Sequence, residues 1–327
     1  MKRTKLTIIV PCYNEQEVLL DTAHRLHILL DELKNTLWIT QSSTLCLVCD
    51  GSHDKTWEII KELADKIEHV HGIKLSRNFG HQNAILAGLF SSSCDVAITI
   101  DADLQDDPES IREMLAAHQG GADVVYGVRR YRSSDTFFKR QTAQVYYCLL
   151  ARLGIKIIYN HADYRLLSAR AIEALRCYPE QNIFLRGIVP QLGFNTTVVY
   201  YDRRAREAGE TKYPLKKMIQ FALDGITSLS VAPLRAITWF GLCVSLLSFS
   251  GGIWAIWERI VNGVGVPGWA STLVPIFFLG GLQLLSLGVI GEYIGKTFIE
   301  SKSRPRYIIE EEIHRGSSTK NYRPPPF

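Results

Sequence analysis

The sequence predicts a doubly wound α/β domain with a mostly parallel sheet, followed by a segment that enters a membrane. Short apolar, β-branched runs alternate five times with helical patterns over about the first 130 residues, which is typical of such a sheet. Polar and charged side chains gather where these runs end. Further along, residues 236–257 and 260–291 contain no charged residue, and each stretch exceeds the roughly 20 residues that a membrane helix needs. The 327 residues are therefore expected to form a soluble domain and a membrane-bound one.

The expected strands and helices follow one another in a regular order. The expected strands are residues 6–10, 45–49, 73–76, 95–100 and 123–128, the first of them stopped by Pro11. Amphipathic or small-residue-rich patterns predict helices over residues 16–33 and 83–90. Two more helices are expected to begin near Lys55, where Asp54 is a suitable N-cap, and near Pro108, because proline suits a first helical turn.

Asp101 and Asp103 directly follow the fourth expected strand, at the point where it leaves the sheet. Open α/β sheets bind ligands at this carboxyl edge. Two carboxylates one residue apart on a turn can converge on Mg²⁺ or Mn²⁺, ions that commonly hold nucleotide phosphates. The alternative is a solvated acidic turn that caps the next helix, but the buried strand before the pair and Pro108 after it favour the metal site. No Gly-x-Gly-x-x-Gly follows the first strand, which excludes a dinucleotide-binding Rossmann unit.

Charge and cysteine content exclude other classes of protein. The net charge is only +4 with both signs abundant, so nucleic-acid binding is not indicated. Seven cysteines form no disulfide framework, and no second Cys or His pair completes a zinc pattern. Cys46 and Cys49 lie three apart within an expected strand, so they should face opposite sides of the sheet. The cysteines are therefore interpreted as buried apolar residues in a reducing compartment, and residues 1–5 do not begin a signal peptide.

The second half of the chain is predicted to bind the membrane. Residues 214–233 are interpreted as an amphipathic interfacial helix, with a linker helix packed on the soluble domain as the alternative. Two spans are expected at about residues 234–257 and 273–297, and glycines in the second would permit close helix contact. The loop between the spans holds only one basic residue, Arg259, whereas the other flanks are rich in them, which places both termini in the cytoplasm. The predicted soluble domain, interfacial helix, two-span segment and tail are residues 1–213, 214–233, 234–299 and 300–327.

Three motifs mark the ends of expected strands: Pro11-x-Tyr13-Asn14-Glu15, Asp50-Gly51-Ser52-x-Asp54 and Asp101-x-Asp103-x-Gln105-Asp106. With these motifs the chain resembles glycosyltransferase family 2, whose fold is termed GT-A. Later motifs narrow the resemblance to the polyprenyl-phosphate branch, which includes bactoprenol glucosyltransferases and dolichol-phosphate mannose synthases. These later motifs occupy residues 163–168, 184–187 and 201–213, and the resemblance spans about residues 5–300.

The resemblance implies roles for individual residues. Asp101, Asp103 and Gln105 would hold Mg²⁺ or Mn²⁺. Asp103 and Asp163 are the implied catalytic carboxylates, and the role of Asp163 is open between proton transfer, metal contact and orientation. The implied contacts to the nucleotide sugar are Pro11, Tyr13, Glu15, Asp50, Arg77, Asp101 and Arg129. The implied phosphate-binding residues are Arg140, Arg203, Arg206 and Lys212. A solvated basic loop is the alternative for residues 203–206.

The implied reaction is the metal-dependent, inverting transfer of a single hexose from a UDP-sugar to undecaprenyl phosphate at the bacterial inner membrane, with the loop between the spans in the periplasm. The lipid-linked sugar would then modify a cell-envelope glycan such as the O-antigen of lipopolysaccharide. Glucose is the first expectation, with mannose, N-acetylglucosamine and aminoarabinose as alternatives. A processive polysaccharide synthase is disfavoured because no Gln-x-x-Arg-Trp motif appears. A non-catalytic scaffold or flippase partner is disfavoured because the residues implied to bind the metal are all present. The resemblance also implies that this chain can form a homo-oligomer, because related enzymes include tetramers.

Overall fold

The computed structural model describes residues 3–103, 105–130, 161–181, 183–202, 231–262, 269–315 and 317–319. The described residues fall into two units, one of which combines residues 3–202 with residues 303–319. The other unit contains residues 231–302. The first unit carries the sheet and the candidate site, and the second carries the apolar helices.

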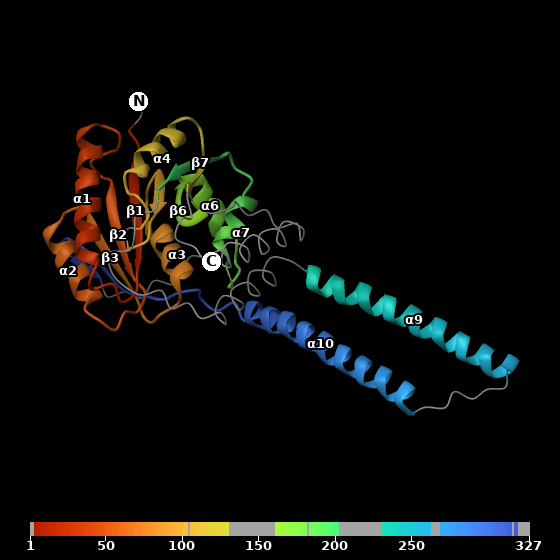
Figure 1. The fold of residues 1–327 in the computed structure, drawn as a ribbon. Coiled ribbons are helices and arrows are strands. Elements are labelled where there is room, and N and C mark those ends of the chain that lie inside the picture. The colour runs from red at the N-terminus through yellow and green to blue at the C-terminus, as the bar shows by residue number, and fades with distance from the viewer. Residues whose placement is uncertain are drawn as a thin grey trace. The chain divides into compact units, whose positions relative to one another are not determined.

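The first unit is built on one sheet, whose described strands have the order β7-β5-β6-β4-β1-β2-β3-β8-β9 (Figure 1). The strands are β1 (Leu6–Cys12), β2 (Thr44–Cys49), β3 (Val70–Leu75), β4 (Val96–Thr99), β5 (Val124–Arg129), β6 (His161–Ser168), β7 (Thr196–Tyr201), β8 (Ile309–His314) and β9 (Ser317–Thr319). Strands β4, β1, β2 and β3 are parallel to one another, and β5 is parallel to β7. Strand β6 is antiparallel between β4 and β5, and β8 is antiparallel to β3. The predicted mostly parallel α/β sheet is confirmed.

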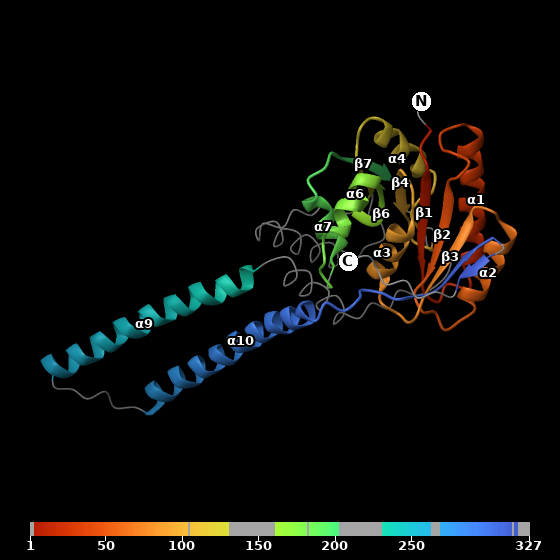
Figure 2. The ribbon, with the colours of Figure 1, turned by 180° about the vertical axis from the view of Figure 1, so that it is seen from behind.

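Helices cover both faces of the sheet (Figure 2). Helices α1 (Leu19–Asn35), α2 (Thr56–Lys66) and α4 (Ser110–Gln119) pack on one face, and α3 (His81–Ser91), α6 (Ala169–Arg176) and α7 (Leu185–Gln191) pack on the other. Side chains along a strand alternate between these two cores, because successive residues point to opposite faces. Cys46 lies in the second core and Cys49 in the first, which confirms that they cannot act as a pair. Both thiols are free and buried.

Strand β1 runs through Pro11, where we expected it to stop. Pro11 is paired with Val48 of β2 and Cys12 with Cys49. On the other side, the pairing with β4 ends where Ile9 meets Thr99. Proline lacks the N–H that a strand with neighbours on both sides must donate. Because β4 no longer pairs with β1 at Pro11, the missing donor breaks no hydrogen bond on that side.

Strand β8 departs from the predicted tail over residues 300–327. Ile309, Glu311 and Ile313 all face inward, although three consecutive glutamates read as a solvated segment. Glu311 is 6% exposed, and its Oε2 accepts a hydrogen bond of 3.3 Å from the indole N–H of Trp57. Lys61 Nζ lies 3.4 Å from its other oxygen. Because the inward-facing Glu311 is charged, the sequence does not show the alternation of buried and exposed positions that is typical of a strand. The proline-rich end, residues 322–327, lies outside the described residues.

The second unit contains two long helices, α9 (Ala232–Asn262) and α10 (Trp269–Ser301). Within them, Pro233–Gly251 and Phe278–Ser301 are long and apolar enough to cross a membrane, and neither stretch is buried within the structure. They overlap the two predicted spans, while the direction in which the spans cross stays a prediction. Most of the predicted interfacial helix, residues 214–230, lies outside the described residues.

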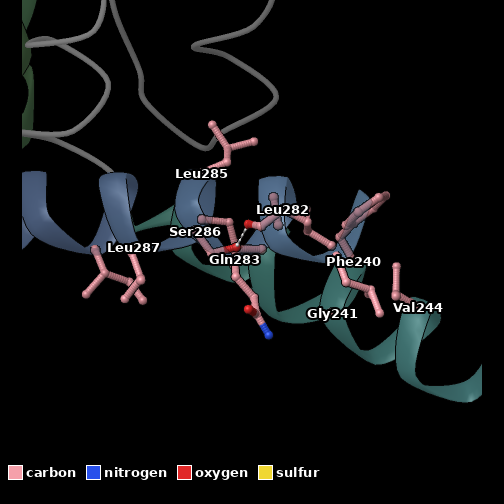
Figure 3. A pocket seen from close by; sticks show the side chains of 12 residues that line it. Phe240, Gly241, Val244, Leu282, Gln283, Leu285, Ser286 and Leu287 are labelled. Carbon is pink, nitrogen blue, oxygen red and sulfur yellow. Dashed lines mark hydrogen bonds between the residues drawn. The ribbon is translucent and has the colours of Figure 1, made fainter. Parts of the chain in front are cut away.

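A groove of about 960 Å³ lies between α9 and α10, lined by residues such as Phe240, Val244 and Leu282 (Figure 3). Two of its lining residues, Gln283 and Ser286, are polar, and the Ser286 hydroxyl donates to the carbonyl of Leu282 at 2.9 Å. Among the described residues, the glycines of the second predicted span make no close helix contact. A Cβ added at Gly280, Gly281, Gly288 or Gly291 would meet no atom within 4 Å.

Candidate active site

The turns that follow β1 and β2 hold each other at the carboxyl edge of the sheet. The side-chain oxygen of Asn14 accepts the backbone N–H of His53 at 2.9 Å, and Ser52 Oγ accepts the N–H of Asn14 at 3.1 Å. Asn14 has a φ of 56°, a left-handed conformation that asparagine tolerates well. Thr56 Oγ1 also accepts the N–H of Glu15 at 2.9 Å. The first two sequence motifs therefore form one rigid rim, on which the side chain of Tyr13 is 42% exposed.

Asp50 fixes a third turn to this rim. It is 2% exposed, and its two oxygens accept the backbone N–H groups of Phe79 at 2.7 Å and Gly80 at 2.9 Å. Burial raises the pKa of Asp50, and the two N–H donors oppose that shift. Arg77 is exposed on the same turn, with its guanidinium 4.0 Å from the centre of the Phe79 ring. Asp50 thus positions the turn that carries Arg77, and contact of either residue with a nucleotide stays a prediction.

Gly51→Ala is expected to disrupt this edge of the sheet. Gly51 has a φ of +63°, and an added Cβ would lie 2.3 Å from the carbonyl carbon of Arg77 and 2.4 Å from the N of Asn78. Both contacts are with backbone atoms, so the turns after β2 and β3 would have to separate. We expect the free energy of unfolding to fall by about 2–4 kcal/mol, from backbone strain plus overpacking. Chemical denaturation measures this loss.

Gly80→Ala is the matched control for Gly51→Ala. Gly80 also has a positive φ, +92°, but an added Cβ would meet no atom within 4 Å. Only the backbone strain remains, which is worth about 1–3 kcal/mol in this region, where φ is 92° and ψ is 152°. Equal losses in the two variants would show that the close approach of the turns contributes nothing.

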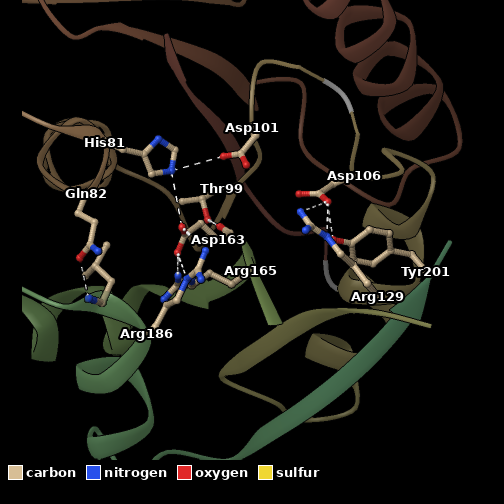
Figure 4. Close-up of polar contacts among 11 residues, drawn as sticks. His81, Gln82, Thr99, Asp101, Asp106, Arg129, Asp163, Arg165, Arg186 and Tyr201 are labelled. Atoms are coloured by element: carbon tan, nitrogen blue, oxygen red, sulfur yellow. Dashed lines mark hydrogen bonds and ion pairs between the residues drawn. The ribbon is translucent and has the colours of Figure 1, made fainter. Parts of the chain in front are cut away.

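Three side chains from three elements meet beyond the end of β4: Asp101, Asp163 of β6 and His81 at the start of α3 (Figure 4). His81 Nε2 lies 3.4 Å from Asp101 Oδ1 and 3.7 Å from Asp163 Oδ2. The backbone supports this arrangement, because β4 pairs with β6 and the Thr99 hydroxyl donates to the carbonyl of Asp163. Two of the predicted site carboxylates therefore share one imidazole neighbour.

Asp163 is held by two arginines. Its Oδ1 forms a short ion pair with Arg165, which is 1% exposed, and its Oδ2 lies 2.9 Å from Arg186 Nη2. Burial on its own would raise the pKa of Asp163, but Arg186 and Arg165 outweigh it and hold that pKa well below the usual range. A carboxylate this acidic is a poor proton acceptor near neutral pH. Of the roles left open for Asp163, orientation and metal contact agree with a carboxylate that stays ionised, and its role stays a prediction.

A separate cluster joins Asp106, Arg129 and Tyr201 (Figure 4). Arg129 Nη2 lies 3.0 Å from Asp106 Oδ1, and the Tyr201 hydroxyl donates to the same oxygen at 2.5 Å. Asp106 is 1% exposed, and its Oδ2 is buried with no hydrogen-bond partner among the described residues. The charge of Arg129, which we predicted to face the nucleotide sugar, is therefore paired with Asp106. Its predicted contact with the substrate is untested.

The donor set at Asp101 and Asp103 fits a hard divalent cation. Burial raises the pKa of Asp101 to about 6, His81 opposes that shift, and the carboxylates of Asp106, Asp163 and Asp103 add to it. A divalent cation would relieve this repulsion, and carboxylate oxygens suit Mg²⁺ or Mn²⁺. The N–H of Gln105 donates to Asp103 Oδ1 at 3.2 Å, while Gln105 itself is only 4% exposed. Metal contact by the Gln105 side chain stays a prediction.

The predicted phosphate-binding residues Arg140, Arg203, Arg206 and Lys212 lie outside the described residues.

Residues 7–193 match the family model described as glycosyl transferase family 2. The chain belongs to glycosyltransferase family 2. It is 50% identical over 311 residues to the uncharacterized glycosyltransferase YkoT of Bacillus subtilis (strain 168), which covers 94% of this chain and 92% of that protein. It is 41% identical over 314 residues to the SfII prophage-derived bactoprenol glucosyl transferase of Shigella flexneri, covering 96% and 99%. A solved glucosyl-3-phosphoglycerate synthase from Mycobacterium tuberculosis is 16% identical with a TM-score of 0.47, covering 69% of this chain and 79% of that one.

Family 2 membership confirms the predicted resemblance, the GT-A fold and the assignment as a glycosyltransferase. Four residues of the site had no predicted role: His81, Arg165, Arg186 and Tyr201. Each belongs to a segment that the sequence marked, namely a strand end or one of the later motifs. A motif does not show which carboxylate an arginine will pair with, so these partners required the structure.

Proposed function

We propose that this family 2 enzyme transfers a single hexose, with glucose as the first candidate, from a UDP-sugar to polyprenyl phosphate. The observation that carries the proposal is an acidic, cation-fitting site in the same chain as two apolar helices. It is supported by relatives named bactoprenol glucosyl transferase, which align over nearly their whole length, both helices included. Mannose, N-acetylglucosamine and aminoarabinose stay alternatives because no described contact distinguishes the sugars.

In this proposal some residues of the site neutralise charge and others orient the substrates. Asp101 and Asp103 would hold Mg²⁺ or Mn²⁺, which when bound neutralises charge on the leaving diphosphate. An oxygen of the lipid phosphate forms a bond to the anomeric carbon, the bond from that carbon to UDP breaks, and the configuration inverts. The second pKa of a phosphate monoester lies near 6, so the acceptor is already ionised and needs little help from a base. The low pKa of Asp163 agrees with an orienting role beside the sugar.

We further propose that the enzyme resides in the bacterial inner membrane with its sheet domain and both termini in the cytoplasm. The basic residues that flank the two predicted spans support this orientation. The two apolar helices would hold the enzyme close to the headgroup of its lipid acceptor. The lipid-linked hexose would serve as the donor for modification of an envelope glycan.

Purified full-length enzyme with Mg²⁺, short-chain polyprenyl phosphate and radiolabelled nucleotide sugars tests the proposal. Label should move from UDP-glucose into the organic phase and should stay in water when EDTA is added. Transfer from GDP-mannose or UDP-N-acetylglucosamine alone would correct the sugar and keep the reaction. Long water-soluble chains would indicate a polymerising synthase, and transfer from no donor would overturn the proposal.

A further inference from the structure

A second cluster of ligand-type side chains lies outside the candidate active site. It consists of His27 and Asp31 of α1 and His69, which precedes β3. His27 Nδ1 is 2.9 Å from His69 Nε2 and 3.4 Å from Asp31 Oδ2. One ligand atom from each residue can be chosen so that all three lie within 4.8 Å of one another. Two imidazole nitrogens and a carboxylate oxygen therefore lie close together.

The fold places these three side chains together. His27 and Asp31 are four residues apart on α1, so they share a face of the helix. His69 is fixed by its backbone, because its carbonyl accepts the N–H of Leu45 of β2 at 2.8 Å. The side chains of His69 and His27 are 12% and 27% exposed, while that of Asp31 is 46% exposed. The cluster is thus held from two elements and open to solvent on the carboxylate side.

The cluster lies at the amino ends of the parallel strands, whereas the carboxylates of the active site lie at their carboxyl ends. Strands β3, β2, β1 and β4 are all parallel. His69 comes before the amino end of β3, whereas Asp101 follows the carboxyl end of β4. A strand of six residues such as β3 spans about 20 Å at ~3.3 Å per residue. The cluster therefore cannot contribute a ligand or a proton to sugar transfer.

We propose that His27, Asp31 and His69 bind a structural divalent transition metal, with Zn²⁺ as the best match. Imidazole nitrogens favour zinc and its neighbours over Mg²⁺, which prefers oxygen ligands. In a tetrahedral zinc site with bonds of ~2.0–2.1 Å, ligand atoms lie about 3.4 Å apart. The separations of 2.9 and 3.4 Å from His27 are close to this spacing, and the third pair, His69 and Asp31, lies within 4.8 Å. The exposed side of the cluster leaves room for water as a fourth ligand.

Some charges near the cluster favour a bound cation and others oppose it. Asp31 supplies a negative charge to the cluster, and a neutral imidazole has a lone pair that can bind a metal. Lys34 Nζ lies 3.8 Å from Asp31 Oδ1 and opposes a cation there, although it faces the oxygen that His27 does not. Without metal, the two rings can share one proton in a hydrogen bond. With metal, α1 is joined to the turn before β3, which stabilises the folded state by mass action.

Cobalt spectroscopy on the full-length enzyme tests the site, because Co²⁺ in a tetrahedral nitrogen–oxygen site absorbs visible light far more strongly than Co²⁺ bound octahedrally by oxygens. We expect strong absorption that Zn²⁺ displaces and Mg²⁺ does not. His27→Gln and His69→Gln should each abolish the absorption and the rise in melting temperature with Zn²⁺. The matched control is His24→Gln, an exposed histidine one turn earlier on α1, which should retain both.

An assay of sugar transfer distinguishes loss of metal at this cluster from damage to the active site. His69→Gln should keep its Mg²⁺-dependent transfer within about twofold, since the cluster lies at the other edge of the sheet. Strong absorption that survives in both the His27 and His69 variants would place the metal elsewhere and overturn the proposal. A wild-type enzyme with no strong absorption and no thermal response to Zn²⁺ would overturn it as well. The circular dichroism of each variant establishes that it is folded.

Discussion

Asp101→Asn is expected to lower the rate of sugar transfer by about 100-fold or more, the size of loss seen when one preorganised electrostatic contact is removed from an active site. Asparagine keeps the shape of the side chain but loses the negative charge that, with Asp103, would hold the cation. Two neighbouring carboxylates, Asp106 and Asp163, are already paired with arginines, so they should compensate poorly for the lost charge. The variant should also bind Mn²⁺ more weakly, which titration calorimetry of the enzyme without substrate measures directly.

Folding should be unaffected by Asp101→Asn. Burial and nearby acids raise the pKa of Asp101, so loss of its charge removes repulsion in the free enzyme. The melting temperature should therefore stay the same or rise while activity falls, a combination that a structural role would not give. The control is Asp21→Asn, which alters an exposed ion pair with Arg25 on α1 and should leave both quantities unchanged. An Asp101→Asn enzyme with more than a third of the normal rate would remove this residue from the metal site.

Strands β1 to β5 were predictable because they are mostly apolar, whereas β7, which is parallel to β5, was not predicted. Strands β1, β2, β4 and β5 are almost entirely buried, whereas His71 and Lys74 of β3 are partly exposed, and each of the five was expected within a few residues of its observed bounds. Strands β6 and β8 are antiparallel and carry charged residues inward, Arg165 and Glu311, which are 1% and 6% exposed. Hydrophobic periodicity cannot detect a strand whose inward charges are paired inside the fold, as Arg165 is with Asp163 of the same strand. Glu311 finds its partners, Trp57 and Lys61, on α2.

The location of the site was predictable and its internal pairing was not. Parallel strands end at one edge, where open α/β sheets bind ligands, and Asp50, Arg77 and Asp101 all follow such strands. The structure adds that Asp50 holds the turn of Arg77 through two backbone hydrogen bonds. It also pairs Arg129 with Asp106, three residues beyond Asp103. Which charges are neutralised by protein and which are left for a ligand depends on side-chain geometry, and that decides the chemistry.

Arg165→Met is expected to lower the free energy of unfolding by about 3 kcal/mol, because it removes one partner of a buried ion pair. Asp163 would then depend on Arg186 alone. Part of the loss is offset, since Nε and Nη1 of Arg165 are buried without hydrogen-bond partners among the described residues and methionine removes them. On an Asp163→Asn background the same substitution should cost much less, because no buried carboxylate charge would be left unpaired. Chemical denaturation of the four proteins in this double-mutant cycle measures the coupling.

The coupling should also depend on pH with a defined sign. The pKa of Asp163 is lower in the folded protein than in the unfolded chain, so its ion pairs contribute fully above the unfolded value of about 4. That contribution is lost as the pH falls further, toward the folded value. The difference between wild type and Arg165→Met should therefore shrink below about pH 4. A coupling near zero at neutral pH would mean that Arg165 does not hold Asp163 ionised, and the case against Asp163 as a proton acceptor would fall with it.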